Sequence, residues 1–410
     1  MQTQLADFIR DTPEGREADR ILRTCVHCGF CLATCPTYQL LGDELDSPRG
    51  RIYLMKRMLE GEPASEKTLL HLDRCLTCRA CETTCPSGVA YGRLLDIGRH
   101  LAEQRVGRSP AARMERRLLR YVLAKRHRFA PLLALGRSLR PLLPASLRRQ
   151  IPEPRPAGAW PAARHARRML VLAGCVQPAL APNINAAAAR VLDRLGISLV
   201  EAPEAGCCGA LSFHLNAQDE ARDYMRANID AWWPHVEAGV EAIVMTASGC
   251  GVMVRDYGHY LRDDPRYAER ARRISALTRD VSEVVQGEAE RLAPLVKGSK
   301  AEQVGAVAVH TPCTLQHGQK LRGLLERILE GAGVKLAPAP EGHLCCGSAG
   351  TYSILQKALS QQLLARKVAA LESGHPARIV TANIGCLLHL QTGTRLPVSH
   401  WVELLDELIA

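Results

Sequence analysis

Sixteen cysteines in a chain of 410 residues constrain the fold more than any other feature, because most of them recur at fixed, close spacings. Eight of them form two runs of identical spacing, C-x2-C-x2-C-x3-C, each followed by proline. The runs are Cys25, Cys28, Cys31 and Cys35, and then Cys75, Cys78, Cys81 and Cys85. A disulfide framework would scatter its cysteines more widely, so the spacing indicates metal or cluster binding.

The spacing of each run suits a cubane 4Fe-4S cluster. A C-x2-C-x2-C loop can bind three irons, and in two-cluster ferredoxins the last cysteine of each run ligates the other cluster. On that rule one cluster is expected on Cys25, Cys28, Cys31 and Cys85, and the second on Cys75, Cys78, Cys81 and Cys35. Zinc is the alternative, although zinc sites usually combine two separated C-x2-C pairs.

The residues around the two runs predict helices. Residues 47–60 read as a capped amphipathic helix with Ile52, Met55 and Leu59 on one stripe, and a second helix is expected over 66–73. We therefore expect residues 1–110 to form an α-helical ferredoxin-type domain with two 4Fe-4S clusters.

Residues 111–168 form a basic, proline-rich connector. Residues 99–170 contain 18 lysines and arginines against 3 acidic residues. A helical stripe of apolar residues is expected beside a set of arginines: Met114, Leu118, Tyr121 and Val122 beside Arg113, Arg116, Arg117 and Arg120. Such a segment predicts docking on an acidic partner or on the inner face of the membrane. Nucleic acid is the least favoured partner, since no nucleic-acid-binding motif accompanies the charge.

The remaining residues contain an internal repeat of four cysteines. Cys175, Cys207, Cys208 and Cys250 recur as Cys313, Cys345, Cys346 and Cys386, at offsets of 138, 138, 138 and 136 residues. Glycine follows the cysteine pair in both halves, giving a Cys-Cys-Gly (CCG) turn. The repeat predicts a first CCG domain with its connecting segment over 169–303 and a second over 304–410.

Strands and helices alternate in each half. Strands are expected at 169–173 and 242–246, and at 306–309 and 378–381. Helices are expected at 186–195 and 321–329, each followed by a short strand before the CCG turn. Alternation predicts a parallel sheet, whose sites form at the carboxyl ends of strands, where these cysteines lie. The eight CCG cysteines are therefore candidate ligands of a further iron-sulfur cluster, or small buried residues.

Other features limit what the chain does alone. The N-terminus lacks a secretory pattern and no apolar stretch reaches about 20 residues, so we expect a cytoplasmic protein with at most peripheral membrane contact. No G-x-G-x-x-G opens a strand-to-helix turn, so hydride chemistry is expected on a partner.

The two cysteine runs followed by two CCG domains resemble the family of glycolate oxidase iron-sulfur subunits. Residues 38–45, 228–233 and 344–350 carry the resemblance together with the first run. The resemblance implies a complex with two FAD-type subunits that oxidise glycolate to glyoxylate, FAD on those partners only, and electron relay through this chain to a quinone or other acceptor. It implies neither a catalytic residue nor stand-alone activity here.

The same architecture is shared more widely, which leaves alternatives. Anaerobic glycerol-3-phosphate dehydrogenase, lactate-utilisation iron-sulfur proteins and heterodisulfide reductase use similar parts. A subunit of a D-lactate or glycerol-3-phosphate dehydrogenase complex, or a CCG-type thiol or disulfide reductase, is therefore the alternative function. One departure weakens the last: heterodisulfide reductase has a fifth cysteine per domain where this chain has Ala247 and Asn383.

Overall fold

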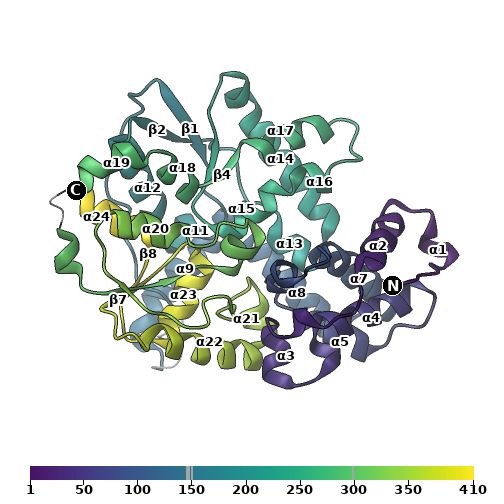
Figure 1. Cartoon of the computed structure of the whole chain (residues 1–410). Coiled ribbons are helices and arrows are strands. Elements are labelled where there is room, and N and C mark those ends of the chain that lie inside the picture. Colours follow the sequence, from purple (N-terminus) through teal and green to yellow (C-terminus); the bar gives the residue numbers. More distant parts are fainter. Residues whose placement is uncertain (145–147, 149–150, 298–299) are drawn as a thin grey trace. The chain divides into compact units, whose positions relative to one another are not determined.

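The computed structural model describes residues 1–144, 148, 151–297 and 300–410 (Figure 1). Parts of the expected connector 111–168 and of the expected segment 169–303 thus lie outside the described residues. The chain forms two compact units, each built from two stretches of sequence. One comprises residues 1–116 and 343–367, and the other residues 117–342 and 368–410.

The N-terminal stretch is helical, as the sequence predicts. Its elements are α1 (Asp7–Arg10), α2 (Pro13–Thr24), η1 (Phe30–Leu32), α3 (Pro36–Leu41), η2 (Glu44–Asp46), α4 (Pro48–Leu59), α5 (Glu66–Asp73), α6 (Ala80–Thr84) and α7 (Tyr91–Val106). The helices expected over 47–60 and 66–73 are α4 and α5, so both predictions are confirmed.

Local sequence signals explain where these helices begin. Thr12, Ser47 and Ser65 each accept a hydrogen bond from a backbone N–H three residues ahead, which satisfies a donor that the first turn leaves open. Proline opens α2, α3 and α4, where its missing N–H costs nothing. The apolar stripe of α4, with Ile52, Met55 and Leu59, is buried in the helical core.

The connector helices are α8 (Pro110–Leu123) and α9 (Arg126–Leu139), followed by η3 (Arg140–Leu142). The stripe expected on α8 exists but does not face a core: Met114, Leu118 and Tyr121 are 61%, 58% and 57% exposed. Among the helices of the described residues, none combines the length and the apolar character needed to cross a membrane.

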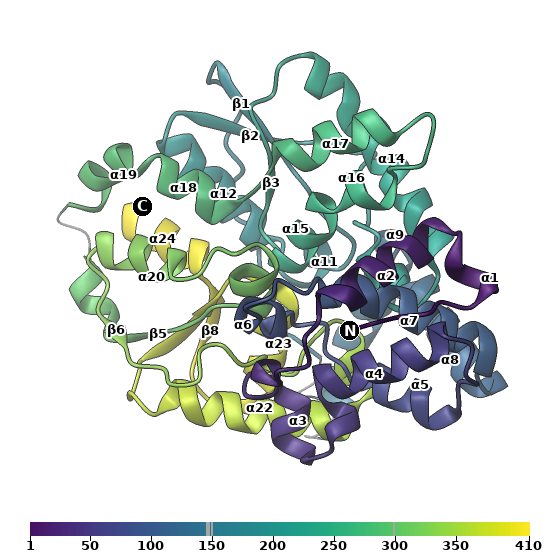
Figure 2. The same ribbon diagram turned by 45° about the vertical axis from the view of Figure 1, so that its right-hand side comes forward.

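Each CCG half contains a four-stranded parallel sheet. The first has the order β2-β1-β3-β4 and the second β6-β5-β7-β8, so the order is the same in both halves. Strands of both sheets are labelled in Figure 2. The bounds are β1 (Arg167–Val171), β2 (Ile197–Glu201), β3 (Ile243–Met245), β4 (Thr278–Asp280), β5 (Val307–His310), β6 (Leu336–Ala337), β7 (Arg378–Thr381) and β8 (Val398–His400).

Helices connect these strands. In the first half they are α11 (Gln177–Leu180), α12 (Asn183–Arg194), α13 (Ala210–His214), α14 (Gln218–Glu237), α15 (Ser248–Arg255), α16 (Tyr257–Tyr260), α17 (Ala268–Leu277), α18 (Val281–Gly287), α19 (Ala289–Val296) and η4 (Lys300–Val304). In the second half they are the π-helical turn η5 (Thr314–Gly318), α20 (Leu324–Gly331), α21 (Tyr352–Leu355), α22 (Lys357–Glu372), α23 (Ile384–Gly393) and α24 (Trp401–Ile409).

The predicted fold class, a helical ferredoxin-type domain followed by two repeated parallel α/β domains, is thus confirmed. The fourth strand of each sheet, β4 and β8, is an element that the sequence analysis missed. Both are three residues long and end at a residue that caps the next helix, Asp280 and His400. Their sequences, TRD and VSH, contain no and one apolar residue respectively, so neither gives the apolar signal of a buried strand.

Candidate iron-sulfur sites

The two cysteine loops of the N-terminal stretch share an unusual backbone. His27 and Thr77, each just before the second cysteine of its run, have φ of 57° and 53°. Gly29 and Arg79, each just after that cysteine, have φ of 84° and 58°. Left-handed backbone is costly for residues other than glycine, so three of these four positions are held there by the surrounding fold. The sequence repeat is therefore also a repeat of conformation.

The first expected ligand set lies around one pocket. Cys25, Cys28, Cys31 and Cys85 all line it, together with Cys81 of the other set. Burial raises the pKa of Cys25, and the thiols of Cys85 and Cys28 raise it further. Burial also raises the pKa of Cys31 to about 11, followed by the influence of Cys25. Cys28 is exposed, so this site borders on solvent.

The second expected set is more deeply enclosed. Burial raises the pKa of Cys81, and Cys78, Cys75 and Cys35 act on it in the same direction. All four of these cysteines are buried. The last cysteine of the first run is thus near enough to act on the third cysteine of the second run, which fits an exchange of ligands between the runs.

Polar groups surround the second set. The hydroxyl of Tyr91 donates to Cys75 Sγ at 3.7 Å, and Arg51 Nη1 lies 4.0 Å from Cys35 Sγ. Arg51 is fully buried, and it also donates to the backbone carbonyl of His71 and to Asp46. A buried guanidinium needs such partners, because leaving its charge unpaired away from water costs several kcal/mol.

Two further arginines lie around this loop. Arg74 Nη1 binds the second oxygen of Asp46 at 2.8 Å, so that one carboxylate holds two guanidinium groups. Arg99, buried on α7, donates to the carbonyl oxygens of Leu72 and Cys75 at 2.8 Å and 2.6 Å. The backbone at the start of the second loop is therefore held by the buried guanidinium group of Arg99.

The donors present fit iron-sulfur clusters. Neutral thiols in these surroundings hold their protons tightly, since each thiolate would be repelled by its neighbours and penalised by burial. A bound metal removes that penalty by compensating the thiolate charge. Two sets of four cysteines, reaching across two loops of equal backbone, match the ligand count of two cubane clusters.

The four cysteines of the first CCG half lie together within one compact unit. Side-chain hydrogen bonds connect Cys175 to Cys207, Cys207 to Cys208 and Cys208 to Cys250. The hydrogen bond to Cys207 is the main cause that raises the pKa of Cys175, with burial second. The sequence expectation that these four residues meet at the carboxyl ends of strands is met by this arrangement.

The CCG turn itself depends on its glycine. Gly209 has φ of 90°, and a Cβ there would lie 2.9 Å from the carbonyl oxygen of Ala221. Its N–H donates to Cys207 Sγ at 3.4 Å. Only glycine takes this conformation freely and leaves room for the neighbouring backbone.

Buried side chains form hydrogen bonds to the backbone of the turn. Asn228 Nδ2 donates to the carbonyl oxygen of Cys207 at 2.8 Å, and Tyr257 Oη donates to that of Cys208 at 2.9 Å. Asn228 also accepts from the N–H of Gly206 and donates to Tyr257 Oη. The carbonyl groups of the two adjacent cysteines are thus satisfied inside the core.

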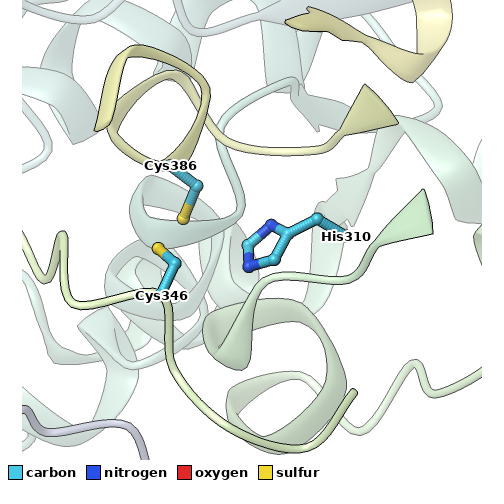
Figure 3. Close-up of side chains that lie close together, drawn as sticks. All are labelled: His310, Cys346 and Cys386. Atoms are coloured by element: carbon cyan, nitrogen blue, oxygen red, sulfur yellow. The ribbon is translucent and has the colours of Figure 1, made fainter. Parts of the chain in front are cut away.

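The second half repeats the turn. Gly347 has φ of 89°, and its N–H donates to Cys345 Sγ at 3.4 Å, as at the equivalent glycine of the first half. Figure 3 draws the side chains of Cys346 in this turn, of His310 at the end of β5 and of Cys386 on α23. Asn383 donates to Cys386 Sγ at 3.5 Å, so an amide occupies the position of the fifth cysteine of heterodisulfide reductase. Ligation by Cys313, Cys345, Cys346 and Cys386 stays a prediction.

Sequence reasoning missed the residues that support the cysteines. Arg51 and Arg99 gave one usable signal, because each lies on the apolar face of its helix, four residues from Met55 and Leu95 respectively. An arginine at a core position of an amphipathic helix indicates a buried partner. Tyr91 and Asn228 carry no comparable signal, since both residue types are common outside functional sites.

Comparisons with known proteins agree with this geometry. A family model described as a 4Fe-4S dicluster domain matches residues 21–89, and one described as a cysteine-rich domain (CCG) matches residues 169–255 and 307–391. The glycolate oxidase iron-sulfur subunit of Escherichia coli (strain K12) is 54% identical over 99% of both chains.

More distant relatives cover the chain differently. The probable glycolate oxidase iron-sulfur subunit of Bacillus subtilis (strain 168) is 31% identical over 91% of this chain and 89% of its own. Lactate utilization protein A of Geobacillus thermodenitrificans is 29% identical, but the match covers 55% of this chain and 92% of that protein.

Proposed function

The chain belongs to the family of glycolate oxidase iron-sulfur subunits, and from that premise we propose that it relays electrons from glycolate oxidation to an acceptor. The flavin of two partner subunits would take electrons from glycolate, giving glyoxylate, and this chain would pass them to a quinone or other acceptor. The observation that carries the proposal is the pair of four-cysteine sets in two loops of equal backbone. A bound 4Fe-4S cluster supplies one-electron exchange.

The ligand sets of the proposal are those of the ferredoxin rule. Cys25, Cys28, Cys31 and Cys85 would hold one cluster, and Cys35, Cys75, Cys78 and Cys81 the other. The mutual influence of Cys25 and Cys85, and of Cys81 and Cys35, supports the exchange of the last ligand between the runs. The proposed domains are 1–110, 111–168, 169–303 and 304–410, and each family match lies inside one of them.

Iron and acid-labile sulfide per chain test the ligand assignment. Two 4Fe-4S clusters give about eight of each on anaerobically purified protein, and further clusters on the CCG cysteines would give about twelve or sixteen. Cys81→Ser, which removes a buried ligand, should lower the iron content, whereas Ser87→Ala, two residues after Cys85, should not. Zinc without iron and sulfide would refute the assignment.

Activity tests the role. The isolated chain should not oxidise glycolate, and addition of the flavoprotein subunits should restore acceptor reduction. Glycolate oxidation by the chain alone, or full acceptor reduction by the flavoproteins without it, would refute the relay. D-lactate in the same assay tests the second candidate, which the relatives named lactate utilization protein A favour.

We place this relay on the cytoplasmic side of the inner membrane, held by the connector. Two apolar stripes on the connector helices are exposed, Met114, Leu118 and Tyr121 on α8, and Leu132, Leu135 and Leu139 on α9. The chain has no acidic residue between Glu115 and Glu153. Exposed apolar stripes in a purely basic segment suit an anionic lipid surface, which takes both apolar side chains and positive charge.

Not every connector arginine is free for such docking. Arg116 binds Asp73, and Arg120 binds Glu220, so replacing either would break an internal ion pair. Arg113 and Arg117 are exposed instead. The set of arginines named from sequence therefore divides into structural and surface members.

Vesicle sedimentation of the full chain tests the docking. The double variant Arg113→Glu with Arg117→Glu should weaken binding to vesicles that contain anionic lipid, and Arg20→Glu, an exposed arginine of α2, should not. Binding of equal strength to neutral vesicles, or unchanged binding by the double variant, would contradict the proposal. Loss of flavoprotein binding in the double variant, without loss of vesicle binding, would assign the surface to a protein partner.

A further inference from the structure

The two proposed cluster sites differ in their surroundings. At the site of Cys35, Cys75, Cys78 and Cys81, all four sulfur atoms belong to buried residues. At the other site Cys28 is exposed, and Cys31 and Cys85 are half-buried. Electrostatic effects of nearby groups are therefore less screened by water and salt at the first of these sites, which we call the enclosed site.

Two side chains act directly on sulfur atoms of the enclosed site. Tyr91, 4% exposed at the start of α7, donates its hydroxyl proton to Cys75 Sγ at 3.7 Å. Arg51, with a fully buried side chain, lies 4.0 Å from Cys35 Sγ through Nη1. One contact brings a dipole and the other a full positive charge.

The charge of Arg51 is not cancelled locally. Its carboxylate partner, Asp46, also binds Arg74 at 2.8 Å, so two guanidinium groups share one carboxylate. The arginine nearest the exposed loop is arranged differently, because Arg49, beside Gly29, is half-exposed and pairs with Glu44 at 2.7 Å. The guanidinium charge of Arg51 beside the enclosed site is thus only partly compensated, whereas Arg49 beside the exposed loop has a carboxylate of its own.

We propose that Arg51 and Tyr91 raise the reduction potential of the enclosed site above that of the exposed site. The inference rests on the proposed function, since it assumes a cluster on each cysteine set. Uptake of one electron adds one negative charge to a cluster and its thiolates. A cation or an O–H donor at a ligand sulfur stabilises the reduced form more than the oxidised form, which makes the potential more positive.

The proposed difference in reduction potential would direct electrons along the chain, because the enclosed site lies near the second CCG turn. Tyr352, in the second CCG half, donates to the carbonyl oxygen of Arg74 at 3.1 Å, next to Cys75 in the chain. Residues 343–367, which include Cys345 and Cys346, belong to the same compact unit as the two cysteine loops. An electron that enters at the exposed site would thus move downhill to the enclosed site, towards the second CCG turn.

A redox titration of the full chain, followed by electron paramagnetic resonance, tests the proposal. We expect two separate waves. Tyr91→Phe keeps the ring and removes one hydrogen bond, so it should shift the higher wave to lower potential and leave the other in place. Arg51→Met should shift the same wave further. Tyr53→Phe, at an exposed tyrosine of α4, is the matched control and should shift neither.

The waves can be assigned independently. Cys28→Ser changes the exposed ligand of the other site, so it should alter the lower wave. The proposal is overturned if Tyr91→Phe and Arg51→Met, each with about eight irons, leave both waves unchanged, or if they move the wave that Cys28→Ser alters. Protein with far fewer than eight irons before any substitution would instead refute the proposed clusters. If Arg51→Met does not fold, Tyr91→Phe alone decides.

Discussion

Replacing Gly209 by alanine should destabilise the first CCG half strongly, for two separable reasons. The backbone has φ of 90° there, and left-handed backbone costs an L-residue with a Cβ about 1–2 kcal/mol. The new Cβ would also lie 2.9 Å from the carbonyl oxygen of Ala221, and overpacking of this kind costs typically about 1–3 kcal/mol. We expect a total loss of about 2–5 kcal/mol.

Two neighbouring glycines separate these contributions. Gly174 has φ of 82°, but among the described residues no atom lies within 4 Å of the position that a Cβ would take there, so Gly174→Ala should lose only the backbone share. Gly206 has neither the left-handed φ nor a close neighbour among the same residues, so Gly206→Ala should gain about 0.4–1 kcal/mol through its stiffer unfolded chain.

Urea unfolding followed by tryptophan fluorescence measures the series. Trp232 lies in the core cluster that contains Cys208, and all four tryptophans belong to the compact unit that carries the three glycines. Midpoints are compared at unchanged slope, since a change of slope signals a different transition. Equal loss in all three variants, or tolerance of Gly209→Ala, would refute the claim that the CCG glycine is required for conformation.

Three further variants give distinct outcomes. Burial raises the pKa of Asp280 to about 6 from 3.8, so between these pH values the folded state keeps a proton that the unfolded state releases. The contribution of Asp280 to the free energy of unfolding should therefore fall by about 3 kcal/mol as the pH rises from about 4 to 6. Burial lowers the pKa of His400 to about 4 from 6.5, so that residue should lower stability as pH falls from about 6.5 to 4, opposing the first effect. Urea midpoints against pH should therefore rise with pH in Asp280→Asn and fall with pH in His400→Asn; equal slopes in the two variants would contradict both assignments. Asn228→Ala should cost about 2–4 kcal/mol, because the buried Cys207 carbonyl and two other polar groups lose their partner, and a midpoint within error of the parent's would show that these hydrogen bonds add nothing.

The sequence predicted the parts of this molecule that depend on local patterns. Serine and proline signals place the starts of α4 and α5, and the fourfold cysteine repeat predicts two equal α/β halves. The edge strands β4 and β8 were missed because their sequences, TRD and VSH, are mostly polar, whereas the equally short β3, IVM, was found from its apolar residues. The apolar stripe of α8 was found, but its exposure was not, since a helical pattern indicates a face and not what covers it.

At the candidate sites, spacing predicted which cysteines would meet, and tertiary structure decided the rest. The left-handed backbone at His27 and Thr77 has no signature in those residue types. The buried arginines near Cys35 and Cys75 come from α4 and α7, and no motif connects these helices to the cysteines. Such long-range support follows from packing, which spacing within one segment does not encode.

The make-up of the N-terminal unit bears on how the chain matures during synthesis. Residues 1–116 form one compact unit with residues 343–367, and Tyr352 reaches back to the carbonyl oxygen of Arg74. Domains of a growing chain generally fold as their residues emerge from the ribosome. Here both cysteine loops emerge early, yet the unit that contains them is complete only when the chain has grown beyond residue 367. A chain released before this point would lack part of that unit. During translation the cysteines are therefore exposed first, and they are enclosed only after residues 343–367 have been made.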